Sequence, residues 1–333
     1  MKISYKHLIE NIQSKPDLNI LSEKLFQLGH EHQVFEEVFD LELTPNRGDC
    51  LSINGILRDL KLFYEINLNK EIYEKEINQL NINFTNDAPN YCKNISFLKI
   101  ELNDVSSNYK GDLKNYFCDL DLKKNNFFTD VSNYISYETG QPTHCYDFSK
   151  IDNYIKLGFL NKKRKFDPLN GEMIELTQED LVFFDKDNEV INLAGIMGGK
   201  NSSCNLDTKS VLVECAYFDP EIIIGKSLKY NINSDAAHKF ERNTDPNCHE
   251  YVLKRFLKIV ADHADIKSVE IFTDNRLKNS TNNIEFNHNK INKVLGTSIS
   301  KEDCIRYLSK LGFILTNDKL EIPSYRHDIT QIN

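Results

Sequence analysis

The chain has 333 residues, of which 40% are hydrophobic and 27% charged, and its formal net charge at pH 7 is −9. This length suits about two domains, or three small ones, and no run approaches the roughly 20 apolar residues that cross a membrane. A nucleic-acid partner would need a local basic face, because the overall charge repels it. No apolar signal segment follows the N-terminus, and none of the eight cysteines forms a Cys-x-x-Cys pair. We therefore expect a cytoplasmic protein with reduced thiols, without a zinc ribbon and without a membrane partner.

The first predicted domain, residues 1–85, is a small α/β unit. Its predicted elements are a helix over 18–28, a strand over 39–43, a turn over 44–49 and a helix over 53–64. Gly29 provides a stop for the first helix, and Asp49 can cap the second. The polar segment 67–79 has little apolar content and is predicted to be a linker or edge region.

The second predicted domain, residues 86–275, is rich in β-structure. Short apolar runs separated by turns predict strands over 95–102, 154–159, 181–184, 190–196 and 210–216. Helices are expected over 113–122, from about 127, over 235–242 and over 246–264. Ser234 is a plausible N-cap of the third of these helices.

The last predicted domain, residues 280–333, is a small helix–strand module. We expect a short helix over 291–296, a second helix after the N-cap Ser300, and a strand over 320–323. The predicted fold class is therefore α+β and multidomain, with a small α/β unit, a central β-rich domain and this module.

Two polar residues of the central domain could carry chemistry. His144 follows the rigid turn at Pro142 and has an ordinary pKa near neutrality, so it could position a water molecule or simply hydrogen-bond at the domain edge. Glu214 lies in an apolar strand, where it either points outward by strand alternation or enters a pocket as a hydrogen-bonding carboxylate. Gly195 and its neighbours lack the lysine of a phosphate-binding loop, so they allow a close backbone approach or simple tight turns.

Seven motifs along the chain closely resemble those of the β subunit of bacterial phenylalanine–tRNA ligase, in the family's order. They are residues 43–52, 130–134, 140–147, 193–199, 213–220, 240–242 and 323–329. The resemblance implies a heterotetrameric enzyme in which the α subunit binds ATP and attaches phenylalanine to tRNA(Phe). It also implies that the central domain hydrolyses mischarged tyrosyl-tRNA. The expected partners are the α subunit and tRNA(Phe), without DNA.

The resemblance also implies roles for individual residues. Glu214 would accept the tyrosine hydroxyl, and His144 would help to place the attacking water. The matching pocket positions are Ser132, Asn133, Ala194, Gly195, Ser234 and Ala236. Asp328 matches the first of the family's acidic positions for Mg²⁺. ATP and Mg²⁺ are expected in the whole enzyme, whereas editing would require no cofactor.

The chain departs from the family at several points. The tRNA-binding barrel common near the N-terminus is absent, because Phe39 leads almost directly into the motif at Leu43. Ser234 stands where threonine is common, and Cys145 where alanine is common. The remaining magnesium positions, the catalytic-like module and the anticodon-binding domain would lie beyond residue 333, so we expect a fragment or a reduced subunit. The alternative to an editing enzyme is a scaffold that binds the α subunit or tRNA without hydrolysis.

Overall fold

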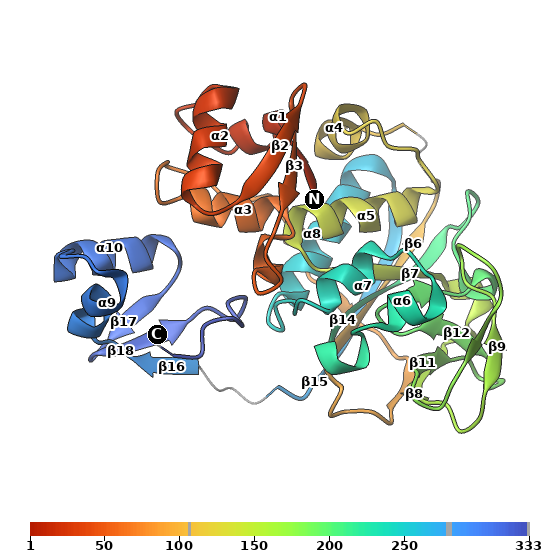
Figure 1. The fold of residues 1–333 in the computed structure, drawn as a ribbon. Coiled ribbons are helices and arrows are strands. Elements are labelled where there is room, and N and C mark those ends of the chain that lie inside the picture. The colour runs from red at the N-terminus through yellow and green to blue at the C-terminus, as the bar shows by residue number, and fades with distance from the viewer. Residues whose placement is uncertain (106–107, 278–281, 332–333) are drawn as a thin grey trace. The chain divides into compact units, whose positions relative to one another are not determined.

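The computed structural model describes residues 1–105, 108–277 and 282–331 (Figure 1). The chain divides into two units, one formed by Met1–Asn69, Glu138–Gly140 and Lys278–Asn333 and the other by Lys70–Tyr137 and Gln141–Leu277. Residues 70–85, expected in the first domain, therefore lie in the larger unit, because their strands β4 (Asn78–Gln79) and β5 (Asn83–Asn86) pair there with β15 and β8. Among the described residues, no helix has the length and apolar character needed to cross a membrane.

The N-terminal part of the smaller unit has a three-stranded antiparallel sheet, ordered β1-β3-β2. Its elements are β1 (Lys2–Ser4), α1 (Tyr5–Ile9), α2 (Leu18–Gln27), β2 (Glu31–Phe35), β3 (Val38–Glu42) and α3 (Ile53–Leu60). Helix α2 begins at its N-cap Asp17, and the chain leaves it through Gly29 with φ +82°. The cap of α3 differs from the prediction. Ser52 accepts the hydrogen bond from the Gly55 amide, whereas Asp49 lies in a 3-10 turn and binds Arg47.

The C-terminal part has a separate three-stranded sheet, ordered β16-β18-β17, and two helices. Its elements are β16 (Asn282–Glu285), α9 (His288–Leu295), α10 (Lys301–Lys310), β17 (Ile314–Thr316) and β18 (Lys319–Ile322). Ser300 caps α10 as predicted, through a bond from the Asp303 amide. Phe286, Phe313 and Leu320 are buried in a small core of their own.

The larger unit contains two five-stranded sheets, ordered β4-β15-β6-β14-β7 and β13-β12-β11-β8-β5. Besides β4 and β5, their strands are β6 (Cys92–Leu102), β7 (Thr143–Asp147), β8 (Tyr154–Phe159), β11 (Leu181–Phe184), β12 (Val190–Leu193), β13 (Met197–Gly198), β14 (Ser210–Phe218) and β15 (Ile266–Asn275). A two-stranded sheet pairs β9 (Arg164–Phe166) with β10 (Ile174–Leu176). The largest described core joins side chains of both five-stranded sheets, among them Phe97 and Phe183.

Figure 1 also shows the helices of the larger unit. They are α4 (Gly111–Asp119), α5 (Phe127–Thr139), α6 (Lys226–Tyr230), α7 (Asp235–Phe240) and α8 (His249–His263). Helix α8 contacts β14 and β6. Strand β14 is thus covered on both faces, by a helix on one side and by the shared core on the other. Every residue from Val211 to Ala216 is buried, which is typical of a strand inside a layered domain.

Candidate functional site

The pairing of β14 with β7 brings the two candidate catalytic side chains together. Glu214 lies directly opposite His144 in the antiparallel ladder. Side chains of opposed residues project from the same face of a sheet, with Cβ atoms about 5 Å apart. Tyr146, two residues beyond His144 on β7, shares that face. Its ring lies 4.5 Å from the His144 ring, edge to face.

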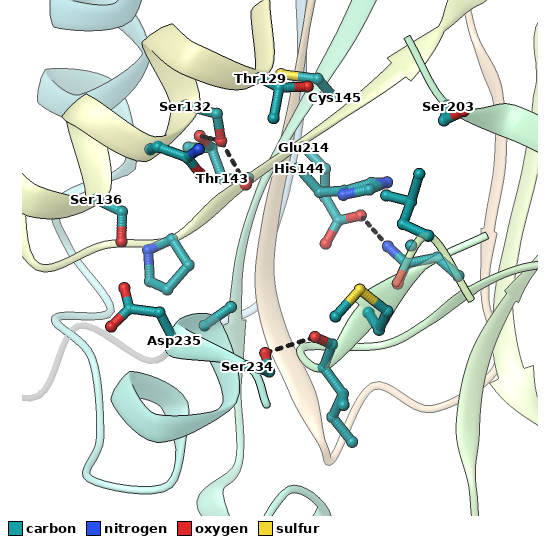
Figure 2. A pocket seen from close by; sticks show the side chains of 18 of the residues that line it. Thr129, Ser132, Ser136, Thr143, His144, Cys145, Ser203, Glu214, Ser234 and Asp235 are labelled. Atoms are coloured by element: carbon teal, nitrogen blue, oxygen red, sulfur yellow. Dashed lines mark hydrogen bonds between the residues drawn. The ribbon is translucent and has the colours of Figure 1, made fainter. Parts of the chain in front are cut away.

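His144 and Glu214 line a cavity of about 380 Å³ within the larger unit. Seven of the residues expected from the sequence contribute to its wall: Ser132, Asn133, His144, Gly195, Glu214, Ser234 and Ala236. Figure 2 shows Ser132, His144, Glu214 and Ser234 around this space, which lies between α5, β7, β14 and the start of α7. Ala194 is the exception, because it is buried beside the cavity and does not line it.

Glu214 is buried in the wall, with only 4% of its surface exposed. The outward orientation suggested by strand alternation is therefore wrong, because both faces of β14 are covered. Tyr146 donates a hydrogen bond of 2.6 Å to its Oε2 atom, and Asn192 reaches the same atom at 3.4 Å. Burial raises the pKa of Glu214 to about 8, although the bond from Tyr146 opposes this shift.

His144 is held in its neutral form. Burial lowers its pKa to about 4, and no described residue hydrogen-bonds its Nε2 atom. A buried polar atom without a protein partner costs about 1–3 kcal/mol unless water or a ligand satisfies it. The ring also needs Gly198, because a Cβ at that position would lie 2.2 Å from His144 Cε1. His144 is therefore a neutral hydrogen-bonding group in the cavity wall, and its Nε2 atom has no partner among the described residues.

Two serines fix the cavity wall. Ser132 on α5 donates to the Thr143 carbonyl at 2.7 Å, which ties the helix to the start of β7. Ser234 caps α7 by accepting from the Ala237 amide, and it donates to the Ile196 carbonyl at 2.6 Å. The second bond links α7 to the turn after β12. Both hydroxyl groups therefore hold in place the elements that form the cavity wall.

Sequence reasoning missed two residues behind the carboxylate, Tyr146 and Asn192. Tyr146 carried a usable signal, since it is two residues from His144 in a strand and therefore on the same face. Asn192 carried none. It reaches Tyr146 from the other sheet, donating to the phenol oxygen at 2.8 Å, and only the packing of the two sheets brings it there.

Asp328, the expected magnesium ligand, lies in the C-terminal part of the smaller unit. Arg326 bonds both of its carboxylate oxygens, at 2.8 and 2.9 Å, and keeps its pKa low against the effect of burial. Among the described residues, Asp328 belongs to no group of three or more close His, Cys, Asp or Glu side chains. Mg²⁺ prefers several oxygen ligands in octahedral geometry. The described residues around Asp328 do not supply such a set of ligands.

The described part of the chain does contain one group of possible metal ligands, formed by His30, Cys50 and Asp59. A cation already occupies this position. The Arg47 guanidinium bonds Asp59 at 2.8 Å and Asp49 at 2.9 Å, and its Nη2 lies 2.7 Å from Cys50 Sγ. The group is therefore better explained as a buried ion cluster that anchors the turn before α3.

Two families match this chain, the B3/4 domain over residues 104–265 and the tRNA synthetase B5 domain over residues 284–332. The chain is 28% identical over 313 residues to the phenylalanine–tRNA ligase β subunit of Idiomarina loihiensis, and 30% identical over 312 residues to that of Francisella tularensis. These alignments cover 90% and 88% of the chain and 38% of each relative. It also resembles the solved N-terminal fragment of the Pyrococcus horikoshii phenylalanyl-tRNA synthetase β subunit, at 16% identity with a TM-score of 0.49, over 99% of this chain and 95% of that one. The chain thus spans about two fifths of the length of the curated relatives.

Proposed function

Because the chain belongs to the family of phenylalanine–tRNA ligase β subunits, we propose that its central cavity hydrolyses tyrosine wrongly attached to tRNA(Phe). The cavity lies in the part of the chain that matches the B3/4 domain. A phenylalanine pocket cannot strongly reject tyrosine, which only adds a hydroxyl, so a second site that recognises this hydroxyl improves accuracy. The cavity is the candidate for that site.

One observation carries this proposal: a buried carboxyl group and an unpartnered neutral imidazole lie opposite each other in one cavity wall. Glu214 Oε2 is bonded by Tyr146, whereas no described residue bonds Oε1. A tyrosyl hydroxyl could bond Oε1, but a phenylalanyl ring would cover it without a partner. Leaving a buried polar group unsatisfied costs about 1–3 kcal/mol, which is roughly a tenfold to hundredfold preference for tyrosine.

The reaction is the hydrolysis of an ester. A water oxygen attacks the carbonyl carbon of the aminoacyl group, the bond to the ribose oxygen breaks, and that oxygen takes up the proton that the water has lost. His144 would accept a hydrogen bond from the water at Nε2 and so orient it. Since its pKa of about 4 makes it a weak base, we assign it to orienting the water rather than to holding a full proton.

We also propose that the chain acts together with a ligase α subunit and tRNA(Phe), as the name of its relatives suggests. In that assembly the α subunit would bind ATP and Mg²⁺ and attach phenylalanine. No step of the proposed hydrolysis requires either cofactor, and Asp328 by itself does not form a magnesium site.

The test compares the deacylation of Tyr-tRNA(Phe) and Phe-tRNA(Phe) by the purified chain, alone and with the α subunit. We expect faster hydrolysis of Tyr-tRNA(Phe), and we expect Glu214→Ala to abolish this preference. Asp180→Asn is the control, because Asp180 is a fully buried carboxylate of the same unit that does not line the cavity. Equal rates on the two tRNAs in both preparations would refute the proposal. Binding of the α subunit without any hydrolysis would instead support the scaffold alternative.

A further inference from the structure

Glu214 does not face the cavity alone, because two side chains behind it hold one of its oxygens. Tyr146 is fully buried and donates to Oε2 at 2.6 Å. Asn192 donates to the Tyr146 oxygen at 2.8 Å and approaches Oε2 at 3.4 Å. Glu214 and Asn192 line the cavity, whereas Tyr146 does not. Tyr146 therefore already makes with Oε2, from outside the cavity, the kind of hydrogen bond that a tyrosyl ligand inside the cavity would make with Oε1.

The direction of these bonds follows from the donors available. Asn192 offers an amide N–H, so the Tyr146 oxygen accepts from it and turns its own hydrogen toward Glu214. Oε2 thus receives two donors, a short one from Tyr146 and a long one from Asn192. A carboxyl oxygen that already accepts two hydrogen bonds is an unfavourable site for the carboxyl proton. When Glu214 is protonated, its proton therefore belongs on Oε1.

We propose that Tyr146 and Asn192 are positioning residues that hold Oε2 of Glu214, so that only Oε1, with or without its proton, meets the ligand. This inference rests on the proposed function and adds its specificity mechanism. The protonated group would donate to the tyrosyl hydroxyl, and the ionised group would accept from it. An acceptor that is ionised forms roughly twice as strong a hydrogen bond as a neutral one. The preference for tyrosine should therefore increase as Glu214 loses its proton.

None of the described residues on the surrounding strands brings a cation to the ionised form of Glu214. The titratable groups that face Glu214 or interact with it are His144, Cys145 and Tyr146 on β7, Cys215 on β14 and Cys92 on β6. Burial keeps the thiols and the phenol protonated and the imidazole neutral. The hydrogen bond from Tyr146 is the interaction that favours ionisation, against burial, which opposes it. Removing the hydroxyl should therefore move the ionisation of Glu214 to higher pH.

The decisive variant is Tyr146→Phe, which removes one hydroxyl and keeps the ring. We expect the preference for Tyr-tRNA(Phe) over Phe-tRNA(Phe), as a ratio of kcat/KM, to fall about tenfold at pH 7.5. In the unmodified protein this ratio should increase through about pH 8, and in the variant the increase should occur at higher pH. Rates are taken after subtraction of the spontaneous hydrolysis at each pH. Asn192→Leu should shift the ratio in the same direction by a smaller factor.

Tyr109→Phe is the matched control. Tyr109 is also buried and also donates to a buried carboxylate, Asp130, at 2.6 Å, but Asp130 does not line the cavity, whereas Glu214 does. Tyr109→Phe should lower the free energy of unfolding, but it should change neither the preference for Tyr-tRNA(Phe) nor the pH profile of that preference. A purely structural role of Tyr146 would make the two variants behave alike.

A second measurement needs no tRNA. Infrared difference spectra against Glu214→Gln report the protonated carboxyl group of Glu214 directly, and its titration should move to higher pH in Tyr146→Phe. An unchanged titration, or an unchanged preference and pH profile in a protein that does discriminate, would overturn the inference. A protein with no preference at any pH, but with the shifted infrared titration, would refute the proposed function and leave the positioning role of Tyr146 intact.

Discussion

The burial of Glu214 should make the stability of the protein depend on pH in a defined window. Its pKa is about 8 in the folded protein and 4.5 for the ordinary group, so between these values the folded state retains a proton that the unfolded state has lost. The free energy of unfolding therefore decreases as pH increases, by at most about 1.4 kcal/mol per pH unit from this group. The stabilising contribution is complete below pH 4.5 and lost above pH 8.

His144 has the opposite dependence at lower pH. Its pKa falls from 6.5 to about 4 on folding, so it makes stability increase with pH between these values. The window from pH 6.5 to 8 isolates Glu214 from His144. Urea unfolding at several pH values should show that the free energy of unfolding decreases less across this window in Glu214→Gln than in the unmodified protein. Parallel curves for the two proteins would mean that Glu214 is not held protonated.

Gly198 should be essential for the orientation of His144. In Gly198→Ala the new Cβ would overlap the imidazole, at 2.2 Å from Cε1 and 2.7 Å from Nε2, so the ring must move. Displacing a group by about 1 Å can cost on the order of a hundredfold in rate. We expect the deacylation rate to fall at least tenfold while circular dichroism remains unchanged.

Gly158→Ala tests whether that loss is specific. Gly158 also lies in a strand of the larger unit, but a Cβ there meets its nearest neighbour, Asp87 Cβ, at an ordinary 3.5 Å. This variant should keep the full deacylation rate. A similar loss in both variants would indicate a general effect on the sheets rather than a specific effect on His144.

At the scale of the elements, the cap of α7 joins a helix to the cavity wall. Ser234→Ala removes the bond from the Ala237 amide and the bond to the Ile196 carbonyl. Loss of a cap costs about 1 kcal/mol. Because the second bond holds the turn that lines the cavity, we also expect a higher KM for Tyr-tRNA(Phe). Ser300→Ala removes the cap of α10 in the other unit, so it should cost a similar free energy of unfolding and leave KM unchanged. Equal KM values in the two variants would contradict this role of Ser234.

Elements with local signals were predictable from the sequence, and those that depend on distant partners were not. The caps Ser234 and Ser300 mark the starts of α7 and α10, and both helices begin there. Strand β7 was missed, because residues 143–147 follow a proline and show no apolar alternation. They form a strand because β14, more than 60 residues later, supplies their hydrogen-bond partners. The orientation of Glu214 was open for the same reason, since burial of both faces of β14 depends on the packing of distant elements.

The resemblance of the seven motifs predicted the family, and the B3/4 and B5 domains and the curated relatives confirm it. Motifs identify the residues that line the cavity more readily than those behind it. Tyr146 lies inside one of these motifs, yet its bond to Glu214 depends on side-chain geometry. Asn192 lies outside all seven and acts across two sheets. The specificity of such a site is therefore less predictable from sequence than its location.

At the scale of the whole molecule, the division into two units predicts that a substitution can destabilise one unit without destabilising the other. Arg47 is the test, because its guanidinium neutralises Asp49 and Asp59 within the smaller unit, and the bonds from His30 and Arg47 keep the pKa of Asp59 low despite burial. Removing one partner of a buried ion cluster costs about 3–5 kcal/mol. In Arg47→Met, hydrogen exchange should therefore accelerate in peptides from residues 1–69, while β6 and β14 keep their protection and Tyr-tRNA(Phe) hydrolysis continues.

Lys6→Met is the control for this variant. Lys6 pairs with Glu37 in the same unit, but both side chains are more than half exposed, so the pair should contribute about 0–1 kcal/mol. Exchange should then hardly change anywhere in the chain. If Arg47→Met accelerated exchange equally in residues 1–69 and in β14, the two units would unfold as one cooperative block. Arg47 would then affect the proposed hydrolysis through the stability of the whole chain. The independence of the two units would be refuted.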